Sequence, residues 1–382
     1  MPTILDYVKE NAHKDFGELS LNSVDIAVLN ELGYLPLGEG VDLNQPVSFQ
    51  TLKKIFFAHD QVLAYSFTVR KERVDLLYAV LEAPRYQGLQ LLSYVNEIDS
   101  EYEKQFAAMV VELPKIAHRQ AIFRGTDETF IGWKEDFKMT YMSEIPAQRR
   151  AKQFLIESLE QAPYKLVLSG HSKGGNLALY AASQIESSLQ NKIDQILILD
   201  APGLHDRILE SQGYQLIKDK ILAIRPKESI VGVMLSSDVP SLLVDSKELG
   251  LFQHNVSAWE ITGSHWKLAQ GQTALSQTLE VTFRVWTHEL SKQELKALFD
   301  TVFDLLLDNN ITSIDVFQTD VLKSASLLLG ALSKLPADKR RVLTKSTTSL
   351  LEIFIKSHRE QLTLPSFKSL SGQFKNFFDN KE

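Results

Sequence analysis

The segment LSGHSKGGNL, residues 168–177, constrains the fold more than any other stretch of the 382-residue chain. It follows the apolar run YKLVLSG and leads directly into NLALYAASQIESSL, whose Ala and Leu content favours a helix. Gly170 and Gly174 stand two positions before and after Ser172. Glycines at these positions remove side chains that would collide where a buried strand turns sharply into a helix. The segment therefore predicts a strand, a tight turn that exposes a serine hydroxyl, and a helix.

Apolar runs on either side of this turn predict a mostly parallel sheet. YKLVLSG, QILILDAPG and KILAIRP alternate with helix-forming stretches, and β-α-β alternation is typical of parallel strands buried on both faces. AAMVVEL and HRQAIFRG predict two earlier strands, with Pro114 in their connection. A last short strand, VSAWEI, is expected after residue 255. Together with the serine turn, these runs predict the α/β-hydrolase fold.

The remaining stretches have helical periodicity and suggest how the chain is divided. Helices are expected over most of residues 4–37, 51–69, 71–95 (broken around Pro84) and 147–161. Beyond about residue 264 strand signals fade, and SKQELKALFDTVFDLLLD begins with Ser291 and Glu294 at capping-box spacing. We therefore expect an α/β-hydrolase domain at 1–270, helical to about residue 100, and a helical unit at 271–382. A short helix is expected in the final SFKSLSGQFKNFFDNKE.

Composition excludes several classes of function. The formal net charge of −7 offers no basic surface for nucleic acid. With 0 cysteines the chain has no disulfide, thiolate metal site or cysteine nucleophile. No metal-binding spacing such as His-Glu-x-x-His is present, and we expect neither a metal nor an organic cofactor. The N-terminal residues lack the apolar core of a signal peptide, and no apolar run approaches the ~18 residues of a membrane span. We expect a cytoplasmic protein without an integral membrane segment.

The order of polar residues after the turn indicates a catalytic triad with Ser172 as its nucleophile. In the α/β-hydrolase fold the nucleophile comes first, then the acid, then the histidine. His254, in the loop GLFQHNVSAWEI, best combines this order with a loop setting and is the expected general base. His171, beside the nucleophile, is expected to have a structural role. The other histidines after the turn are His205, His265, His288 and His358.

Two carboxylates remain open as the triad acid. Asp200 ends the run QILILD, at the sheet edge one strand beyond the nucleophile. Glu228 follows KILAIRP, the strand after which most α/β-hydrolases carry their acid. Both satisfy the chain order, so only the distance to the histidine decides between them. We favour Asp200; Asp238 and Asp245 lie further along the same loop.

Two groups are expected to form an oxyanion hole. The backbone N–H of Lys173 begins the helix after the nucleophile, where the helix dipole favours negative charge. The second donor in this fold comes from the loop after an earlier strand, here FRGTD, which nominates Thr126.

These motifs resemble known lipases. A strand ending in Arg-Gly-Thr and an elbow of the form Gly-His-Ser-x-Gly-Gly are similar to class 3 (fungal-type) lipases, in which the hydroxyl residue after Arg-Gly lines the oxyanion hole. Over most of its length the chain also resembles a bacterial lipase-like family common in Firmicutes. The matching segments are LDYV, LNSVDIAVLNELGY, QFAAM, FRGTD, GWKEDF, GHSKGGNLALYAA, DAPG and QHNVSAW. The resemblance implies the hydrolase fold and esterase-type chemistry, but no settled substrate.

We therefore expect a serine hydrolase, a carboxylesterase or lipase-like enzyme that acts through an acyl-enzyme on a small-molecule or lipid ester. A non-catalytic binding protein with the hydrolase fold, a serine peptidase and a thioesterase remain alternatives. The sequence does not indicate an oligomeric state.

Overall fold

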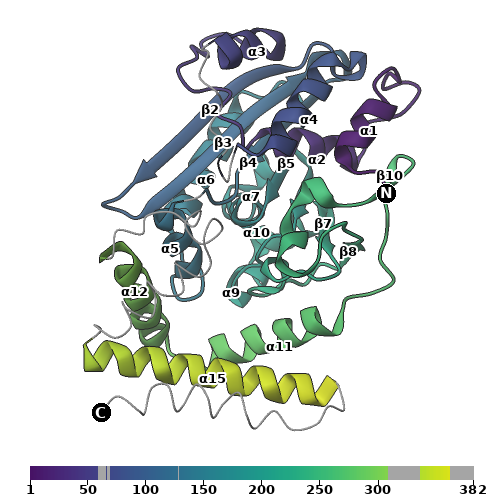
Figure 1. The fold of residues 1–382 in the computed structure, drawn as a ribbon. Coiled ribbons are helices and arrows are strands. Elements are labelled where there is room, and N and C mark those ends of the chain that lie inside the picture. The colour runs from purple at the N-terminus through teal and green to yellow at the C-terminus, as the bar shows by residue number, and fades with distance from the viewer. Residues whose placement is uncertain (59–65, 67–68, 128, 309–335, 362–382) are drawn as a thin grey trace. The chain divides into compact units, whose positions relative to one another are not determined.

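The computed structural model describes residues 1–58, 66, 69–127, 129–308 and 336–361, and the chain divides into two compact units (Figure 1). Unit 1 comprises Met1–Asp127 and Glu144–Gln272, and unit 2 comprises the described residues of Glu128–Ser143 and Thr273–Glu382. The segment from 128 to 143 thus groups with the C-terminal helices, whereas the sequence-based division counts it with residues 1–270. That division into domains stays a prediction.

Unit 1 is built on an eight-stranded sheet whose strands lie side by side in chain order. The strands are β1 (Val47–Ser48), β2 (Gln90–Asp99), β3 (Lys104–Leu113), β4 (His118–Phe123), β5 (Leu166–His171), β6 (Ile193–Leu199), β7 (Ile221–Pro226) and β8 (Ser241–Val244). Pairing is antiparallel from β1 to β4 and parallel from β4 to β8. The predicted α/β-hydrolase fold with a mostly parallel sheet is confirmed.

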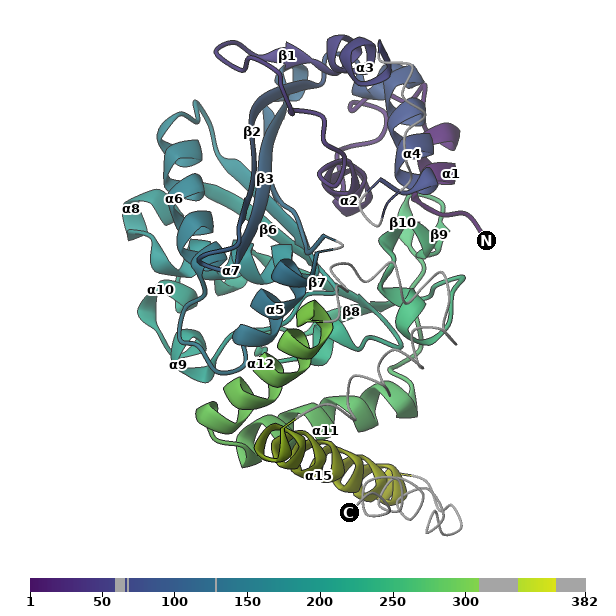
Figure 2. The same ribbon diagram turned by 60° about the vertical axis from the view of Figure 1, so that its left-hand side comes forward.

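Helices cover both faces of this sheet, which explains why most residues of its central strands are buried. Helices α6 and α7 pack on β3 to β6 on one side, and α2 packs on β4 to β6 on the other (Figure 2). All six residues of β5 are buried. The helices of unit 1 are α1 (Ile4–Glu10), α2 (Ser23–Leu32), α3 (Phe49–Ala58), α4 (Lys71–Glu82), α6 (Pro146–Glu160), α7 (Lys173–Gln184), α8 (Ser187–Gln190), α9 (Asp206–Leu209) and α10 (Gln212–Gln215).

Short elements connect these helices and strands. The 3₁₀ turns are η1 (Pro84–Tyr86), η2 (Pro114–Ile116), η3 (Lys218–Lys220), η4 (Val231–Val233), η5 (Gly250–His254) and η6 (Val256–Ala258), and β9 (Ile261–Thr262) pairs with β10 (His265–Trp266). The predicted strand VSAWEI is therefore wrong over its first half, which forms η6. No helix within the described ranges is long and apolar enough to cross a bilayer.

The largest departure from the sequence-based expectation is β2. Residues 71–95 were expected to be mostly helical, but α4 ends at Glu82 and residues 90–99 form a long strand paired with β3. Leu91, Tyr94, Val95 and Ile98 follow one another at spacings of three, one and three, which mimics one face of a helix. Pairing with the buried strand β3 overrides this local pattern, as tertiary context commonly does for strands.

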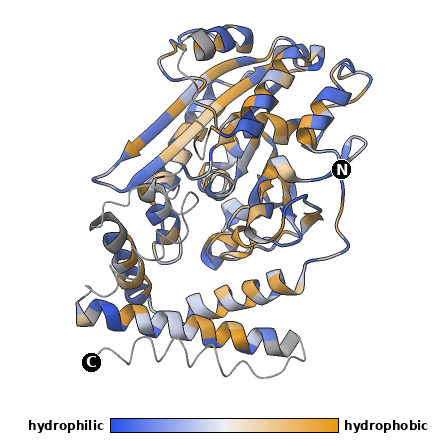
Figure 3. Ribbon diagram, in the orientation of Figure 1, coloured by the Kyte–Doolittle hydropathy of each residue, from blue (hydrophilic) through white to orange (hydrophobic). Residues whose placement is uncertain are grey.

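Unit 2 consists of helices that enclose an aromatic core of their own. Within the residues that the structure describes they are α5 (Phe130–Lys138), α11 (Ala274–Glu289), α12 (Lys292–Asp308) and α15 (Ala337–Gln361), and α11 and α15 carry hydrophobic and hydrophilic residues along their length (Figure 3). Phe137 stacks on Phe299, with ring centroids 4.5 Å apart. The predicted capping box is confirmed, because the Ser291 and Glu294 side chains each accept the other's backbone N–H. The tail helix expected from residue 366 lies outside the described residues.

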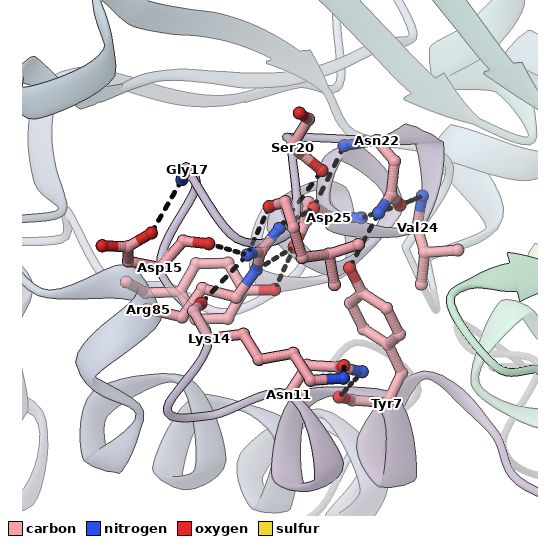
Figure 4. Close-up of polar contacts among 12 residues, drawn as sticks. Tyr7, Asn11, Lys14, Asp15, Gly17, Ser20, Asn22, Val24, Asp25 and Arg85 are labelled. Carbon is pink, nitrogen blue, oxygen red and sulfur yellow. Dashed lines mark hydrogen bonds and ion pairs between the residues drawn. The ribbon is translucent and has the colours of Figure 1, made fainter.

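A buried ion pair ties the N-terminal helices of unit 1 together (Figure 4). Arg85 donates from Nε and Nη2 to the two carboxylate oxygens of Asp25, at 2.9 and 2.6 Å, and both side chains are fully buried. Its Nη1 donates to the backbone carbonyls of Lys14 and Leu19. The Tyr86 hydroxyl donates to the same carboxylate at 2.7 Å. One buried arginine thus donates hydrogen bonds to backbone carbonyls of the loop between α1 and α2.

Removing the carboxylate of this pair is expected to destabilise unit 1 strongly. Asp25→Ala leaves the Arg85 guanidinium buried without its counter-charge, a loss of about 3–5 kcal/mol in the free energy of unfolding. Asp75→Ala is the matched control, because Asp75 pairs with Lys71 on the surface, where such pairs contribute about 0–1 kcal/mol. Urea denaturation followed by circular dichroism measures both. Equal losses in the two variants would contradict this role for the buried pair.

Candidate active site

Ser172 lies on a strained turn between β5 and α7. Its backbone dihedrals are φ 60° and ψ −135°, a combination that L-residues adopt at a cost of about 1–3 kcal/mol unless the surroundings impose it. The turn is held on one side by the Ser172 N–H, which donates to the Leu199 carbonyl on β6 at 3.0 Å. The side chain of Ser172 is partly exposed. The structure thus has the strand, tight turn and helix that the sequence predicts.

The glycines of the motif allow backbone segments to approach closely. A Cβ atom on Gly174 would lie 2.0 Å from the carbonyl oxygen of Phe123, at the end of β4. One on Gly170 would lie 2.3 Å from the backbone of Gly174 itself. Real Cβ atoms do not approach other atoms so closely, so only glycine lets α7 begin directly against β4.

Asp200 stands at the end of β6, next to the nucleophile turn, which is the turn between β5 and α7 around the predicted nucleophile Ser172. Its φ of 42° makes it a second non-glycine residue with a left-handed backbone at this edge of the sheet. The His254 Nδ1 and Asp200 Oδ2 atoms are 2.6 Å apart, and the Asp200 side chain is fully buried. Its other oxygen, Oδ1, accepts from the Ser229 hydroxyl and from the Gly232 N–H, the latter at 3.2 Å. Both carboxylate oxygens therefore have hydrogen-bond partners within the protein.

Glu228, the other candidate acid, has different partners. Its Oε2 accepts from the Gly250 N–H and from Gln253 Nε2, both at 2.7 Å. Glu228 thereby holds the loop that carries His254. Among the hydrogen bonds of the described residues, none joins Glu228 to the His254 imidazole. Of the more distant carboxylates, Asp238 pairs with Lys218 and Asp245 with Lys227 and Lys267. The structure brings Asp200, and not Glu228, to His254 Nδ1.

His254 ends the 3₁₀ turn η5, and the residue before it, Gln253, fixes this turn in the core. Gln253 is fully buried, and its carbonyl accepts from the indole N–H of Trp259 at 2.7 Å. The His254 side chain keeps 26% of its surface exposed. A histidine that is held at Nδ1 but remains accessible can exchange a proton with a substrate through Nε2.

The FRGTD loop lies directly against the nucleophile turn. A Cβ on Gly125 would lie 2.8 Å from the carbonyl oxygen of His171 and 3.0 Å from Cβ of Ser172. Thr126, the next residue, is 5% exposed. This contact brings the loop nominated for the second oxyanion donor to Ser172, the predicted nucleophile.

Lys173 follows Ser172 and has two separate features. Its backbone N–H belongs to the first residue of α7, and the first four N–H groups of a helix lack partners within the helix. Its side chain turns inward and is buried; Nζ donates to the backbone carbonyl and side-chain oxygen of Gln105 on β3, at 3.0 and 2.7 Å. The buried ammonium therefore fastens the start of α7 to the sheet.

His171 is enclosed between Tyr34 and His254. Its Nδ1 lies 2.7 Å from the Tyr34 hydroxyl, and its Nε2 lies 2.9 Å from the backbone carbonyl oxygen of His254. Burial lowers the pKa of His171 well below its ordinary value, and the positive charge that His254 can carry lowers it further. His171 is therefore neutral near pH 7.

The remaining histidines lie in other settings. His205 is the N-cap residue of α9, and His265 is exposed on β10. His288 lies in the last turn of α11 and His358 stacks on Phe354 in α15, both within unit 2. Among the described residues, no group of three or more His, Asp or Glu side chains is suited to hold a metal ion.

Sequence reasoning did not nominate four residues that support this site, namely Tyr34, Ser229, Gly232 and Gln253. Ser229 and Gly232 complete the shell of Asp200, and a Cβ on Gly232 would lie 2.5 Å from its Oδ1. None of the four belongs to a recognisable spacing. Tyr34 and Gln253 lie in segments quoted for the family resemblance, LNSVDIAVLNELGY and QHNVSAW, but the resemblance assigned neither residue a role.

Comparison with known proteins assigns a family. Residues 80–304, more than half of the 382, match the family described as Mbeg1-like. The chain belongs to the Mbeg1-like family. This match includes the nucleophile turn, the end of β6 and the His254 loop. No curated protein matches this Mbeg1-like chain.

Solved structures of lipases are similar to this Mbeg1-like protein in fold. A lipase from Rhizopus microsporus var. chinensis is 14% identical with a TM-score of 0.37, over 68% of this chain and 84% of that one. A nonglycosylated Yarrowia lipolytica lipase is 14% identical with a TM-score of 0.36, over 66% and 88%. A Rhizomucor miehei lipase propeptide complex is 14% identical with a TM-score of 0.34, over 59% and 68%. At these identities the likeness concerns the fold alone.

Adding a methyl group at Gly174 is expected to disrupt the packing of α7 on β4. Gly174→Ala forces a backbone shift, because the new Cβ would lie 2.0 Å from the Phe123 carbonyl oxygen, and overpacking of this kind costs about 1–3 kcal/mol or more. Gly271→Ala is the matched control, since a Cβ added there would have no atom within 4 Å and the φ of Gly271 is not positive. Thermal unfolding measures both; an unchanged melting temperature in Gly174→Ala would contradict this packing.

Proposed function

We propose that this protein is a serine hydrolase of the carboxylesterase or lipase-like kind, with Ser172, His254 and Asp200 as its catalytic triad. The observation that supports this most directly is the 2.6 Å contact between His254 Nδ1 and the buried carboxylate of Asp200. It stands beside a serine with the strained backbone of a nucleophile turn. Chain order, backbone strain and the histidine–carboxylate contact favour the same chemistry.

The triad acts by acyl transfer in two stages. His254 Nε2 takes the hydroxyl proton of Ser172 as Oγ bonds to the ester carbonyl carbon, and the carbonyl electron pair moves onto its oxygen. The tetrahedral intermediate then collapses, the C–O bond to the alcohol breaks, and His254 returns the proton to the departing alkoxide. Water repeats these steps on the acyl-Ser172 ester and releases the carboxylic acid. Asp200 holds the imidazole with its proton on Nδ1 and stabilises the imidazolium that forms.

Two groups stabilise the oxyanion in this proposal. The Lys173 N–H at the start of α7 carries the positive end of the helix dipole. Thr126 contributes from the loop whose Gly125 contacts the nucleophile turn. Donors fixed in advance in this way lower the barrier because they need no reorganisation when charge develops. Removal of one such donor costs about 100- to 1,000-fold in kcat in other hydrolases.

The substrate class that fits this machinery is a small-molecule or lipid carboxylic ester. No step requires a metal or an organic cofactor, because the acid, base and nucleophile are all side chains of unit 1. A serine peptidase or thioesterase would use the same triad, and a non-catalytic binding protein would keep the fold without turnover. A cytoplasmic location, which we expect from the sequence, is also part of this proposal.

Labelling with a fluorophosphonate probe tests the proposed nucleophile. The parent protein is expected to gain one phosphonyl group on Ser172, and Ser172→Ala is expected to gain none. Asp200→Asn is expected to slow labelling by at least about 100-fold, because the imidazole loses its orienting charge. Glu228→Gln is expected to label within about threefold of the parent if Asp200 is the acid. Mass spectrometry of the intact chain and its peptides follows the reaction.

Ser237→Ala is the control for the nucleophile substitution, because Ser237 is exposed and lies outside the site. Labelling that persists in Ser172→Ala would refute the assignment of the nucleophile. A folded parent that is never labelled would favour the non-catalytic binding protein. Faster turnover of peptide p-nitroanilides than of p-nitrophenyl esters would identify a peptidase instead.

A further inference from the structure

Two buried residues outside the triad link the three segments that the proposed chemistry needs. Tyr34 follows α2, 137 positions before His171, and its hydroxyl lies 2.7 Å from His171 Nδ1. On the other side of the ring, His171 Nε2 lies 2.9 Å from the carbonyl oxygen of His254. The chain of contacts thus runs from the N-terminal helices, through the residue before the nucleophile, to the residue proposed as the base.

The chemistry of the partners fixes the proton positions in this chain. A backbone carbonyl can only accept, so the proton of the neutral His171 ring must lie on Nε2 and point at the His254 carbonyl. Nδ1 is then an acceptor, and the Tyr34 hydroxyl donates a hydrogen bond to it. Both nitrogens of His171 are therefore occupied, and the ring is not available as a general base.

Tyr34 also reaches the loop of the proposed oxyanion hole. A Cβ on Gly125 would lie 2.3 Å from the Tyr34 hydroxyl oxygen, so this hydroxyl lies directly against the backbone of the loop. The tyrosine ring is held in turn by Arg73, whose guanidinium carbon lies 3.6 Å from the ring centroid and which pairs with Glu31 at 3.0 Å. One hydroxyl thus joins the FRGTD loop to His171.

At the other end, two contacts orient His254. Asp200 holds its Nδ1, and His171 holds its backbone carbonyl while the two imidazole rings lie 4.4 Å apart at 36°. A side chain fixed at its ring nitrogen and at its own backbone has little freedom to turn. When His254 becomes an imidazolium during acylation, a charged ring at this distance would repel it. The neutral His171 ring avoids that repulsion.

We propose that Tyr34 and His171 are positioning residues, which hold the oxyanion loop, the nucleophile turn and the His254 loop in one arrangement. This inference rests on the proposed function for its catalytic consequence, but the hydrogen-bond network itself can be tested without turnover. Misplacement of a catalytic group by about 1 Å can cost about 100-fold in rate. Loss of the network therefore acts on kcat more than on KM.

Substitutions at His171 separate its two contacts. His171→Gln carries an amide N–H to the position of Nε2 and keeps the donor to the His254 carbonyl. His171→Asn ends at the position of Nδ1, where it can accept from Tyr34 but cannot reach that carbonyl. With a p-nitrophenyl ester we expect kcat to fall about 100-fold in His171→Asn and about tenfold in His171→Gln, with KM within about twofold. Tyr34→Phe, which loses only the hydroxyl, is expected to lose about tenfold.

Matched controls separate positioning from general damage. His265→Gln changes an exposed histidine and Tyr102→Phe an exposed tyrosine, so both are expected to keep the parent kcat. Circular dichroism and melting temperature identify any variant that does not fold. Equal kcat in His171→Gln and His171→Asn, or a loss that appears only in KM, would overturn the positioning role.

Nitrogen-15 spectra of histidine-labelled protein test the network in the absence of substrate. At pH 7 the parent is expected to show His171 as the neutral tautomer protonated on Nε2, and a slowly exchanging His254 Nδ1–H. The latter signal is expected to persist in His171→Gln and to broaden in His171→Asn. A charged His171, or a proton on its Nδ1, would overturn the inference. A parent that neither labels nor hydrolyses esters would instead refute the proposed function, and these spectra would still decide whether His171 orients His254.

Discussion

The parallel pairing of β5 with β6 is the constraint on which the rest of the site depends. His171 and Leu199 are register partners at the ends of these strands, so the next residues, Ser172 and Asp200, leave the sheet at the same edge. Both adopt positive φ values, 60° and 42°. The nucleophile turn and the carboxylate proposed as its acid are thus neighbours because of sheet register, although 28 positions separate them in the chain.

Such backbone conformations persist only where the surroundings impose them. The Ser172 N–H is held by the Leu199 carbonyl, and the Asp200 N–H by the Ile224 carbonyl on β7 at 2.8 Å. The glycines of the turn let α7 begin against β4, and the buried Lys173 side chain ties the helix to Gln105. The strain at the edge of the sheet is therefore offset by the packing and hydrogen bonds around it.

Much of the fold could be predicted because it is encoded locally. The strand–turn–helix around Ser172, the apolar runs of strands β5 to β7 and the capping box at Ser291 are each recognisable from residues that are close together in the chain. Strand β2 could not be recognised, because its apolar residues have helical spacing and only pairing with β3 makes them a strand. Long-range pairing is the information that a single sequence conceals.

The chain order of the site residues could be predicted from the sequence, but the contacts between them could not. Ser172, His254, Thr126 and Lys173 follow from motif and chain order, and their catalytic roles stay predictions. Asp200 and Glu228 satisfied the same order, and only the distance to His254 separates them. Tyr34 lies 137 positions from its partner, so no spacing rule could have found it. The comparisons assign the Mbeg1-like family; the origin in Firmicutes stays a prediction.

Detection of the covalent intermediate tests the central claim most directly. After rapid mixing with p-nitrophenyl acetate and acid quench, we expect a burst of nitrophenolate equal to the amount of active protein, and an acetyl group on the peptide that contains Ser172. The burst and the acetylated peptide are expected to form at the same rate. Hydrolysis without acylation of Ser172, or an acetyl group transferred to a different residue during turnover, would contradict the proposed triad.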